Sequence, residues 1–268
     1  MIGFLPRKRP VRHRPLRSLA ACLTLLACWL AAPVLAGSLQ VSPILLEFGP
    51  ADQAQGLWLS NSGSEPIRAQ VRVQQWTQSE QGDQLAATGD LAASPPILQI
   101  APGEQQLVRI VRIARLPADR EHAYRLLVDE LPASDDAASP GLQFLLRYSV
   151  PVFLLPESAV PVAGQSGERP PTDLSRLSGG FRRGDDGRFV LSLRNDGARR
   201  VRISQLTHVA GDGTRTVLEP GLLGYALAGL QMQWTLSLPP AAATAGVLKA
   251  RFNDDQQEQS LPLDPAGR

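Results

Sequence analysis

The stretch Gly141–Pro156 constrains the fold most, because it combines unusual length with strict alternation of apolar side chains. Side chains two residues apart lie on the same face of a β-strand, at a rise of ~3.3 Å per residue. The stretch therefore predicts one long strand, well beyond the usual length of about five or six residues. Such a strand is either a core strand or an edge that pairs with another chain. Its apolar face would consist of Leu142, Phe144, Leu146, Tyr148, Val150, Val152 and Leu154.

Short alternating segments make up much of the chain before this stretch. Ile67–Trp76 and Gln106–Ala114 alternate apolar and polar residues, as strands with one buried and one solvated face do. Turn sequences such as Asn61-Ser62-Gly63 separate the segments at intervals of about 8–12 residues. We predict about seven strands up to Pro156, which is the pattern of an immunoglobulin-like sandwich. Gln78–Ala93 is polar and is predicted to be a loop.

A second set of short strand segments follows the long stretch. Turn sequences at Asn195-Asp196-Gly197 and Gly211-Asp212-Gly213 separate some of them. Helix is expected only as single turns near Asp119 and Leu222. The predicted strands are Phe189–Leu193, Val201–Val209, Thr214–Leu218, Met232–Leu238, Val247–Phe252 and Ser260–Leu263.

The predicted fold class is all-β, with two immunoglobulin-like β-sandwich domains. The region between them, 157–172, is rich in Pro, Gly, Ser and Glu and is predicted to be a linker. The predicted parts are a signal peptide at 1–36, an N-terminal domain at 37–156 that ends with the long strand, the linker, and a C-terminal domain at 173–268.

The N-terminal segment has the features of a secretory signal peptide. Basic residues up to Arg17 precede the apolar run Leu19–Leu35, and Val34 and Ala36 occupy the −3 and −1 positions of a cleavage site. We predict export and cleavage near Ala36, with no stable membrane insertion afterwards. The alternatives are an N-terminal membrane anchor and lipid attachment at Cys22 or Cys28.

Removal of this segment changes the charge and the cysteine content of the chain. Residues 37–268 hold 21 basic and 25 acidic residues, a net charge of −4, and no cysteine. An acidic chain has no electrostatic support for binding nucleic acid. Without cysteine, disulfides and thiol chemistry are excluded for the mature chain.

No motif in the sequence indicates a catalytic, cofactor or metal site. His122 and His208 are the only histidines after the leader, they fall in different predicted domains, and we expect both at the surface. We expect the acidic pairs in solvated loops rather than in calcium sites, which need ligands that alternate through a loop. We therefore predict that the chain is not an enzyme and binds no cofactor or metal. The acidic pairs are Asp135-Asp136, Asp185-Asp186 and Asp254-Asp255.

Several pieces of the chain, in their order and spacing, resemble one known family. The mature chain resembles the periplasmic chaperones of the chaperone–usher pathway of pilus assembly, in particular their divergent, archaic branch. The resemblance implies two sandwiches set at an angle in a protein of the periplasm. It rests on Val41-Ser42-Pro43, Leu59–Gly63, Pro95-Pro96-Ile97, Ile100–Arg109, Tyr124–Pro132 and Tyr148–Phe153.

This resemblance implies a role for the long strand. In such chaperones the strand is lent to a pilin subunit that lacks its own last strand, and the subunit then passes to an outer-membrane usher. Alternate side chains of the strand fill the groove of the pilin while the backbones pair. The matching donor residues here are Leu142, Phe144, Leu146 and Tyr148. The alternative is that they face the core of this chain's own domain.

The chain departs from the best-known members of the family at the anchor for the C-terminal carboxylate of the pilin. Those members hold the carboxylate with an Arg and a Lys, at positions that are Leu45 and Pro151 here. Our candidate anchors are Arg125, in the otherwise apolar segment Tyr124–Val128, and Arg147, which faces away from the donor side chains. The alternative for either is exposure to solvent or an internal ion pair, for example with Asp129 or Glu130.

Two other functions are consistent with a tandem sandwich. The chain would also suit a secreted structural or adhesive module that binds a sugar or a host protein. Against this, the tryptophans are scattered, and one of them, Trp29, lies in the leader. A carbohydrate enzyme would need two carboxylates 5–10 Å apart in a cleft, and nothing in the sequence indicates such a pair.

Overall fold

The structure is a computed structural model that describes residues 39–117, 119–132, 145–159, 172–184, 188–237 and 246–264. The predicted signal peptide and its cleavage site lie outside these residues. The described elements are strands, except for the short 3₁₀-helix η1 (Glu157–Ala159), so the all-β prediction is confirmed. None of the described helices has the length and apolar character needed to span a membrane.

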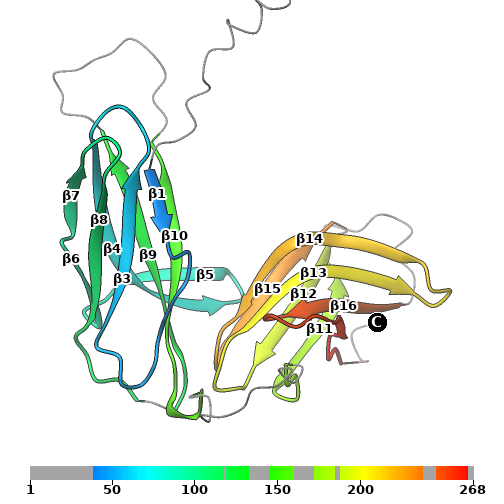
Figure 1. Cartoon of the computed structure of the whole chain (residues 1–268). Helices are drawn as coiled ribbons and strands as arrows, with labels where there is room; N and C mark the ends of the chain where they lie inside the picture. The colour runs from blue at the N-terminus through cyan, green and yellow to red at the C-terminus, as the bar shows by residue number, and fades with distance from the viewer. Residues whose placement is uncertain are drawn as a thin grey trace, which may run out of the picture. The chain divides into compact units, whose positions relative to one another are not determined.

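The first sandwich consists of two facing sheets (Figure 1). One sheet has four strands in the order β1 (Leu39–Ser42), β3 (Ala54–Asn61), β8 (Gln105–Arg112) and β6 (Leu91–Ser94). The other has six, and β7 (Ile97–Ile100) pairs with β4 beside the main path. The order on that path is β2 (Leu46–Phe48), β10 (Arg147–Leu154), β9 (His122–Leu131), β4 (Ile67–Ser79) and β5 (Gly82–Ala87).

Alternation in the sequence decides which side chains enter the core between these sheets. In β4, Ile67, Ala69 and Val71 are buried while Arg68 is exposed, as the periodicity predicts. The core also takes the apolar faces of β3, β8, β9 and β10. Burial of aliphatic side chains from both sheets is the main stabilising contribution, at roughly 25 cal/mol per Å² of apolar surface.

The prediction of a loop at Gln78–Ala93 is wrong, because most of these residues pair with neighbouring strands. β4 continues to Ser79 and turns at Gly82 into β5, and β6 follows. Most β5 side chains are exposed, so no apolar alternation marks this strand in the sequence. Backbone pairing to β4 forms the strand instead, and backbone pairing has no signal in side-chain hydropathy.

The second sandwich also consists of two sheets (Figure 1). One prediction fails here, because Leu222 lies in a strand rather than in a helical turn, and β11 has no counterpart among the predicted strands. Asp119, the site of the other expected helical turn, lies in a bend. One sheet has the order β11 (Leu177–Arg183), β12 (Phe189–Asn195) and β15 (Gln231–Leu236). The other has the order β14 (Arg215–Ala226), β13 (Val201–Ala210), β16 (Gly246–Phe252) and β17 (Gln259–Ser260).

Both sandwiches use the same asparagine corner at the end of a strand. The amide of Asn61 donates to the carbonyls of Glu65 and Ile100 at 2.7 and 3.1 Å, and its oxygen accepts the Gly63 N–H. Asn195 makes the equivalent bonds in the second sandwich, to the carbonyls of Arg199 and Ala226 and from the Gly197 N–H. Both asparagines are buried, so each needs these partners. The two sandwiches therefore repeat a structural device although their sequences differ.

Candidate functional site

Half of β10 is an open edge of its sheet. β10 pairs antiparallel with β9 along its whole length, from Arg147 to Leu154. On its other side β2 pairs in parallel with Val152–Leu154 alone. Among the described strands, none covers the outer side of 147–151. An uncovered edge presents free backbone groups to a further strand.

The predicted donor residues divide into two groups. Leu142 and Phe144 lie outside the described residues. Leu146 and Tyr148 are half-buried and pack against the core of the first sandwich, and the Tyr148 hydroxyl donates to the carbonyl of Leu39. In this part of the strand the apolar register therefore serves the chain's own core, which was the alternative. Donation of these side chains to a pilin stays a prediction.

Arg147 already has a carboxylate partner. It lies opposite Asp129 in the β9–β10 register and forms an ion pair with it. Arg72 binds the same carboxylate at 2.6 Å. Burial raises the pKa of Asp129, but hydrogen bonds and charge from Arg147 and Arg72 outweigh burial and hold the pKa below its usual value. Arg147 thus makes the internal ion pair considered as the alternative to its anchor role.

Arg125 is in a different situation. It lies opposite Pro151 in the β9–β10 register, and its guanidinium stacks on the ring of Trp76 at 3.7 Å. Within the described residues this guanidinium makes no hydrogen bond and no ion pair, although Asp83 is near enough to act on its charge. Burial lowers the pKa of Arg125, yet an arginine stays protonated in proteins. A half-buried cation is costly unless an anion pairs with it, so Arg125 favours the binding of an anion from another molecule.

Arg125 lines a cavity of about 680 Å³ between the two sandwiches. The two sandwiches contact each other and together form one compact body, Gly37–Arg268. Ser149 and Pro151 of the open edge line the same cavity, so β10 and Arg125 form one site. Tyr225 and Trp234 line it from the second sandwich.

Next to this cavity the junction of the two sandwiches is closed. Trp76 and Phe153 of the first sandwich pack with Leu227 of the second. The buried Gln78 donates to the carbonyl of Tyr225 at 2.8 Å and accepts the Leu227 N–H at 2.9 Å. The side-chain amide of Gln78 is thus paired, as burial requires, whereas the buried Nε1 of Trp76 has no hydrogen-bond partner within the described residues.

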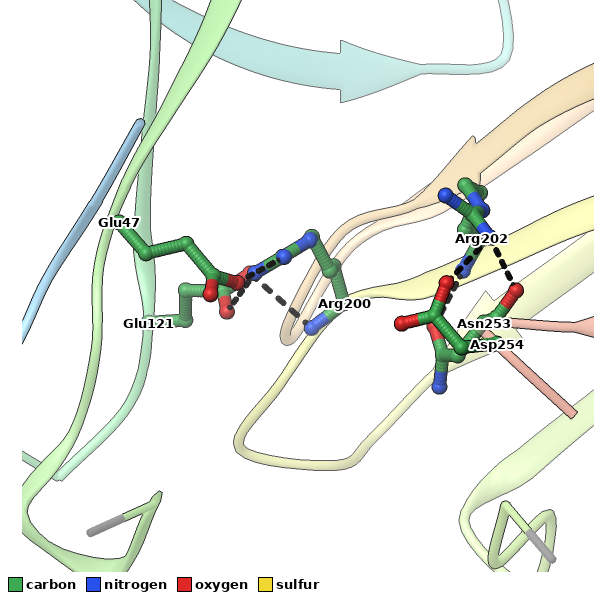
Figure 2. A network of polar contacts seen from close by, with 6 residues as sticks. All are labelled: Glu47, Glu121, Arg200, Arg202, Asn253 and Asp254. Atoms are coloured by element: carbon green, nitrogen blue, oxygen red, sulfur yellow. Dashed lines mark hydrogen bonds and ion pairs between the residues drawn. The ribbon is translucent and has the colours of Figure 1, made fainter. Parts of the chain in front are cut away.

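Arg200 completes the closed junction. Its guanidinium stacks on Phe153 at 3.7 Å and binds the carboxylates of Glu121, at 2.6 Å, and Glu47 (Figure 2). Burial raises the pKa of Glu121, and the charge and hydrogen bonds of Arg200 oppose this shift. Figure 2 also shows Arg202 bound to Asp254 and to the carbonyl of Asn253. Sequence analysis missed Arg200, Glu121 and Gln78, because nothing local marks a contact between residues so far apart in the chain.

The structure also places the histidines, one family anchor position and one of the acidic pairs. His208 is 3 % exposed, so the expectation of a surface histidine is wrong for it; His122 is half-buried. Leu45, at one family anchor position, packs half-buried at the junction. Of the acidic pairs, Asp254-Asp255 is described and its members bind Arg202 and the Thr172 N–H. No cluster of three or more metal-ligating side chains occurs in the part of the chain that the structure describes.

A family model matches the first sandwich. Residues 38–159 match the model of the pili and flagellar-assembly chaperone, PapD N-terminal domain. The first sandwich therefore matches this family, over somewhat less than half of the chain. The family is one of chaperones, which confirms the resemblance and, for the matched residues, agrees with the prediction of a function other than an enzyme's. The match ends at 159, so it does not include the second sandwich.

Two curated chaperones are similar to part of the chain. The chaperone protein PapD of Escherichia coli is 27 % identical over 139 residues, which are 50 % of this chain and 55 % of PapD. The chaperone protein PmfD of Proteus mirabilis (strain HI4320) is 31 % identical over 92 residues, 33 % of this chain and 35 % of PmfD. The chain thus matches about half of one curated relative and about a third of the other.

Solved structures share the fold of both sandwiches. A chain of the CsuC–CsuE chaperone–tip adhesion subunit pre-assembly complex, from archaic chaperone–usher Csu pili of Acinetobacter baumannii, aligns with a TM-score of 0.62 and 23 % identity. The alignment covers 84 % of this chain and 98 % of that one. The complex of the Salmonella enterica SafA pilin with the SafB chaperone contains a chain that aligns with a TM-score of 0.55 and 16 % identity, over 85 % and 97 % of the two chains. These likenesses confirm the two-domain immunoglobulin-like fold.

Proposed function

We propose that this chain is a periplasmic chaperone that binds pilin subunits by strand donation and delivers them to an outer-membrane usher. The observation that carries the proposal is the open edge of β10 beside Arg125, a half-buried cation with no carboxylate partner in the described residues. An edge and a free cation in one cavity suit a chain end that pairs as a strand and terminates in a carboxylate.

Strand addition explains the use of the open edge. The backbone of 147–151 would pair with an edge of the subunit, and alternate side chains would enter the groove of the subunit. Leu142 and Phe144 would contribute about 1.5–3 kcal/mol each if they became fully buried there. Covering the exposed edge of a subunit in this way would prevent its aggregation. Exchange of β10 for a better-fitting pilin strand would then drive assembly at the usher.

Arg125 supplies the chemistry that a C-terminal carboxylate requires. A guanidinium binds a carboxylate through two parallel hydrogen bonds. Arg125 would take over from the two bases that the family places at the positions of Leu45 and Pro151, and it lies directly across from the second of these. Arg147 is the weaker candidate for the anchor, because its guanidinium already forms an ion pair with Asp129.

Partners and location follow from the same proposal. The matched complexes pair a chaperone with a tip adhesion subunit and with a pilin, which supports pilin subunits as the partners here. We propose the periplasm as the location, reached by export with cleavage near Ala36. We also keep domains 37–156 and 173–268, joined by the linker 157–172, as part of the proposal. It includes no cofactor, metal or nucleic acid.

The test is co-purification from the periplasm of the native host with the chain tagged at its C-terminus. We expect a small secreted partner, identified by mass, that is lost with Phe144→Glu and kept with Gln143→Lys, the neighbouring control. If no such partner appears, or if Phe144→Glu unfolds the chain, the long strand belongs to the chain's own core. The secreted structural or adhesive module would then be the better function.

A further inference from the structure

Most of the cavity lining that the second sandwich provides is apolar or aromatic: Leu222, Leu223, Tyr225, Met232 and Trp234. The second sandwich also provides Ser204 and Arg202, and the guanidinium of Arg202 is already bound to Asp254 and to the carbonyl of Asn253. Arg125 therefore shares the cavity with a largely apolar surface from the second sandwich.

Two features indicate that the apolar part of the cavity is shaped to receive a side chain. Of the lining residues, Ile44 in the first sandwich is 81 % exposed and Leu222 in the second is 53 % exposed, so each sandwich contributes uncovered apolar surface. Trp234, another lining residue, lies against the backbone at Gly224, where a Cβ atom would come within 2.9–3.3 Å of the indole ring. Glycine at this position lets the indole approach the strand closely.

We infer that this cavity selects the C-terminal residue of the bound subunit by its side chain, and that it takes a bulky apolar or aromatic residue. The inference rests on the proposed function. With the terminal carboxylate on Arg125, the last side chain is confined to the same cavity, where the second sandwich provides the apolar wall. Asp83, which also lines the cavity, repels an acidic side chain, and Arg202 of the same cavity is already bound to Asp254.

The test uses the full chaperone and its co-purified subunit, produced as variants that differ only in the last residue: Leu, Phe, Ala or Asp. Dissociation constants of the complexes are measured for each. We expect Leu and Phe to bind about tenfold or more tighter than Ala, since an apolar pocket discriminates by roughly this factor per missing group, and Asp to bind most weakly. The natural subunit, by its intact mass and sequence, should end in a bulky apolar residue.

Two chaperone variants test the wall itself. Leu222→Ser should weaken binding of the Leu-terminated subunit roughly tenfold and that of the Ala-terminated subunit much less. Val217→Ser is the matched control, because Val217 lies on the same strand, is 61 % exposed and does not line the cavity. Val217→Ser should change the affinity for neither the Leu-terminated nor the Ala-terminated subunit.

The outcomes separate the inference from the proposed function. If all four subunits bind equally, or if Leu222→Ser and Val217→Ser act alike, the selection is overturned. The proposed function then stands provided that Arg125→Ala still weakens the complex. If no subunit binds the chaperone at all, both are overturned.

Discussion

Arg125 and Arg200 are the same kind of residue in the same kind of contact, yet their surroundings differ. Each guanidinium stacks on an aromatic ring at 3.7 Å, Arg125 on Trp76 and Arg200 on Phe153. Arg200 is bound by two carboxylates, whereas Arg125 makes no ion pair within the described residues. One cation joins the two sandwiches, and the other faces an open cavity.

The difference shows which half of the junction is structural and which is available for binding. A buried charge is tolerated when partners satisfy it, and Arg200, Glu121 and Glu47 meet this condition. Arg125 stacks on Trp76, and within the part of the chain that the structure describes its guanidinium makes no hydrogen bond or ion pair. The paired charge of Arg200 contributes to the stability of the free chain. The charge of Arg125 would contribute to binding, once a ligand with a carboxylate enters the cavity.

The largest effect on stability is expected for Arg200→Ala. It leaves the buried carboxylate of Glu121 without its charge partner, which costs about 3–5 kcal/mol. The free energy of unfolding in urea measures it. Arg194→Ala is the control, because Arg194 pairs with Asp196 at an exposed site and should change stability by less than about 1 kcal/mol. Equal effects of the two variants would contradict a structural role for Arg200.

A smaller loss is expected for Gln78→Ala. The substitution leaves the buried Leu227 N–H and the Tyr225 carbonyl unsatisfied, at a cost of about 1–3 kcal/mol. Denaturant unfolding measures it, and Gln84→Ala on the exposed strand β5 is the control. No loss with Gln78→Ala would show that the closed junction contributes nothing to stability.

Asp129 should produce a pH-dependent effect of about 1 kcal/mol. Its folded-state pKa lies below the ordinary value of 3.8, so its contribution is present above that pH and is lost as the pH falls through the folded-state pKa. Asp129→Asn should therefore be less stable than wild type at pH 7, and the difference should shrink in acid. A difference that stays constant with pH would refute the ion pairs as its cause.

The smallest effect on stability is expected for Arg125→Ala. Loss of the stacking on Trp76 is offset by removal of a desolvated charge, so the change stays below about 1 kcal/mol. Thermal unfolding of the free chaperone measures it. A loss as large as that of Arg200→Ala would mean that Arg125 is structural after all.

Strands with one buried face could be predicted from the sequence, but contacts between strands could not. β4 follows from alternation, whereas β5 has exposed side chains and no such signal. Arg125 could be singled out because a charge interrupts an apolar segment. The same argument applied to Arg147, and only the register, which sets it opposite Asp129, separates the two. Arg200 pairs with residues 79 and 153 positions away, a relation that no local pattern contains.

The most direct test of the central claim is a double-mutant cycle on the carboxylate. The affinity of the co-purified subunit is measured with its C-terminus free or amidated, for wild-type chaperone and for Arg125→Ala. We predict that amidation weakens binding to wild type by about 2 kcal/mol or more and barely affects binding to Arg125→Ala, since the two changes remove the same contact. If amidation weakens both complexes equally, Arg125 does not hold the carboxylate and the claim fails.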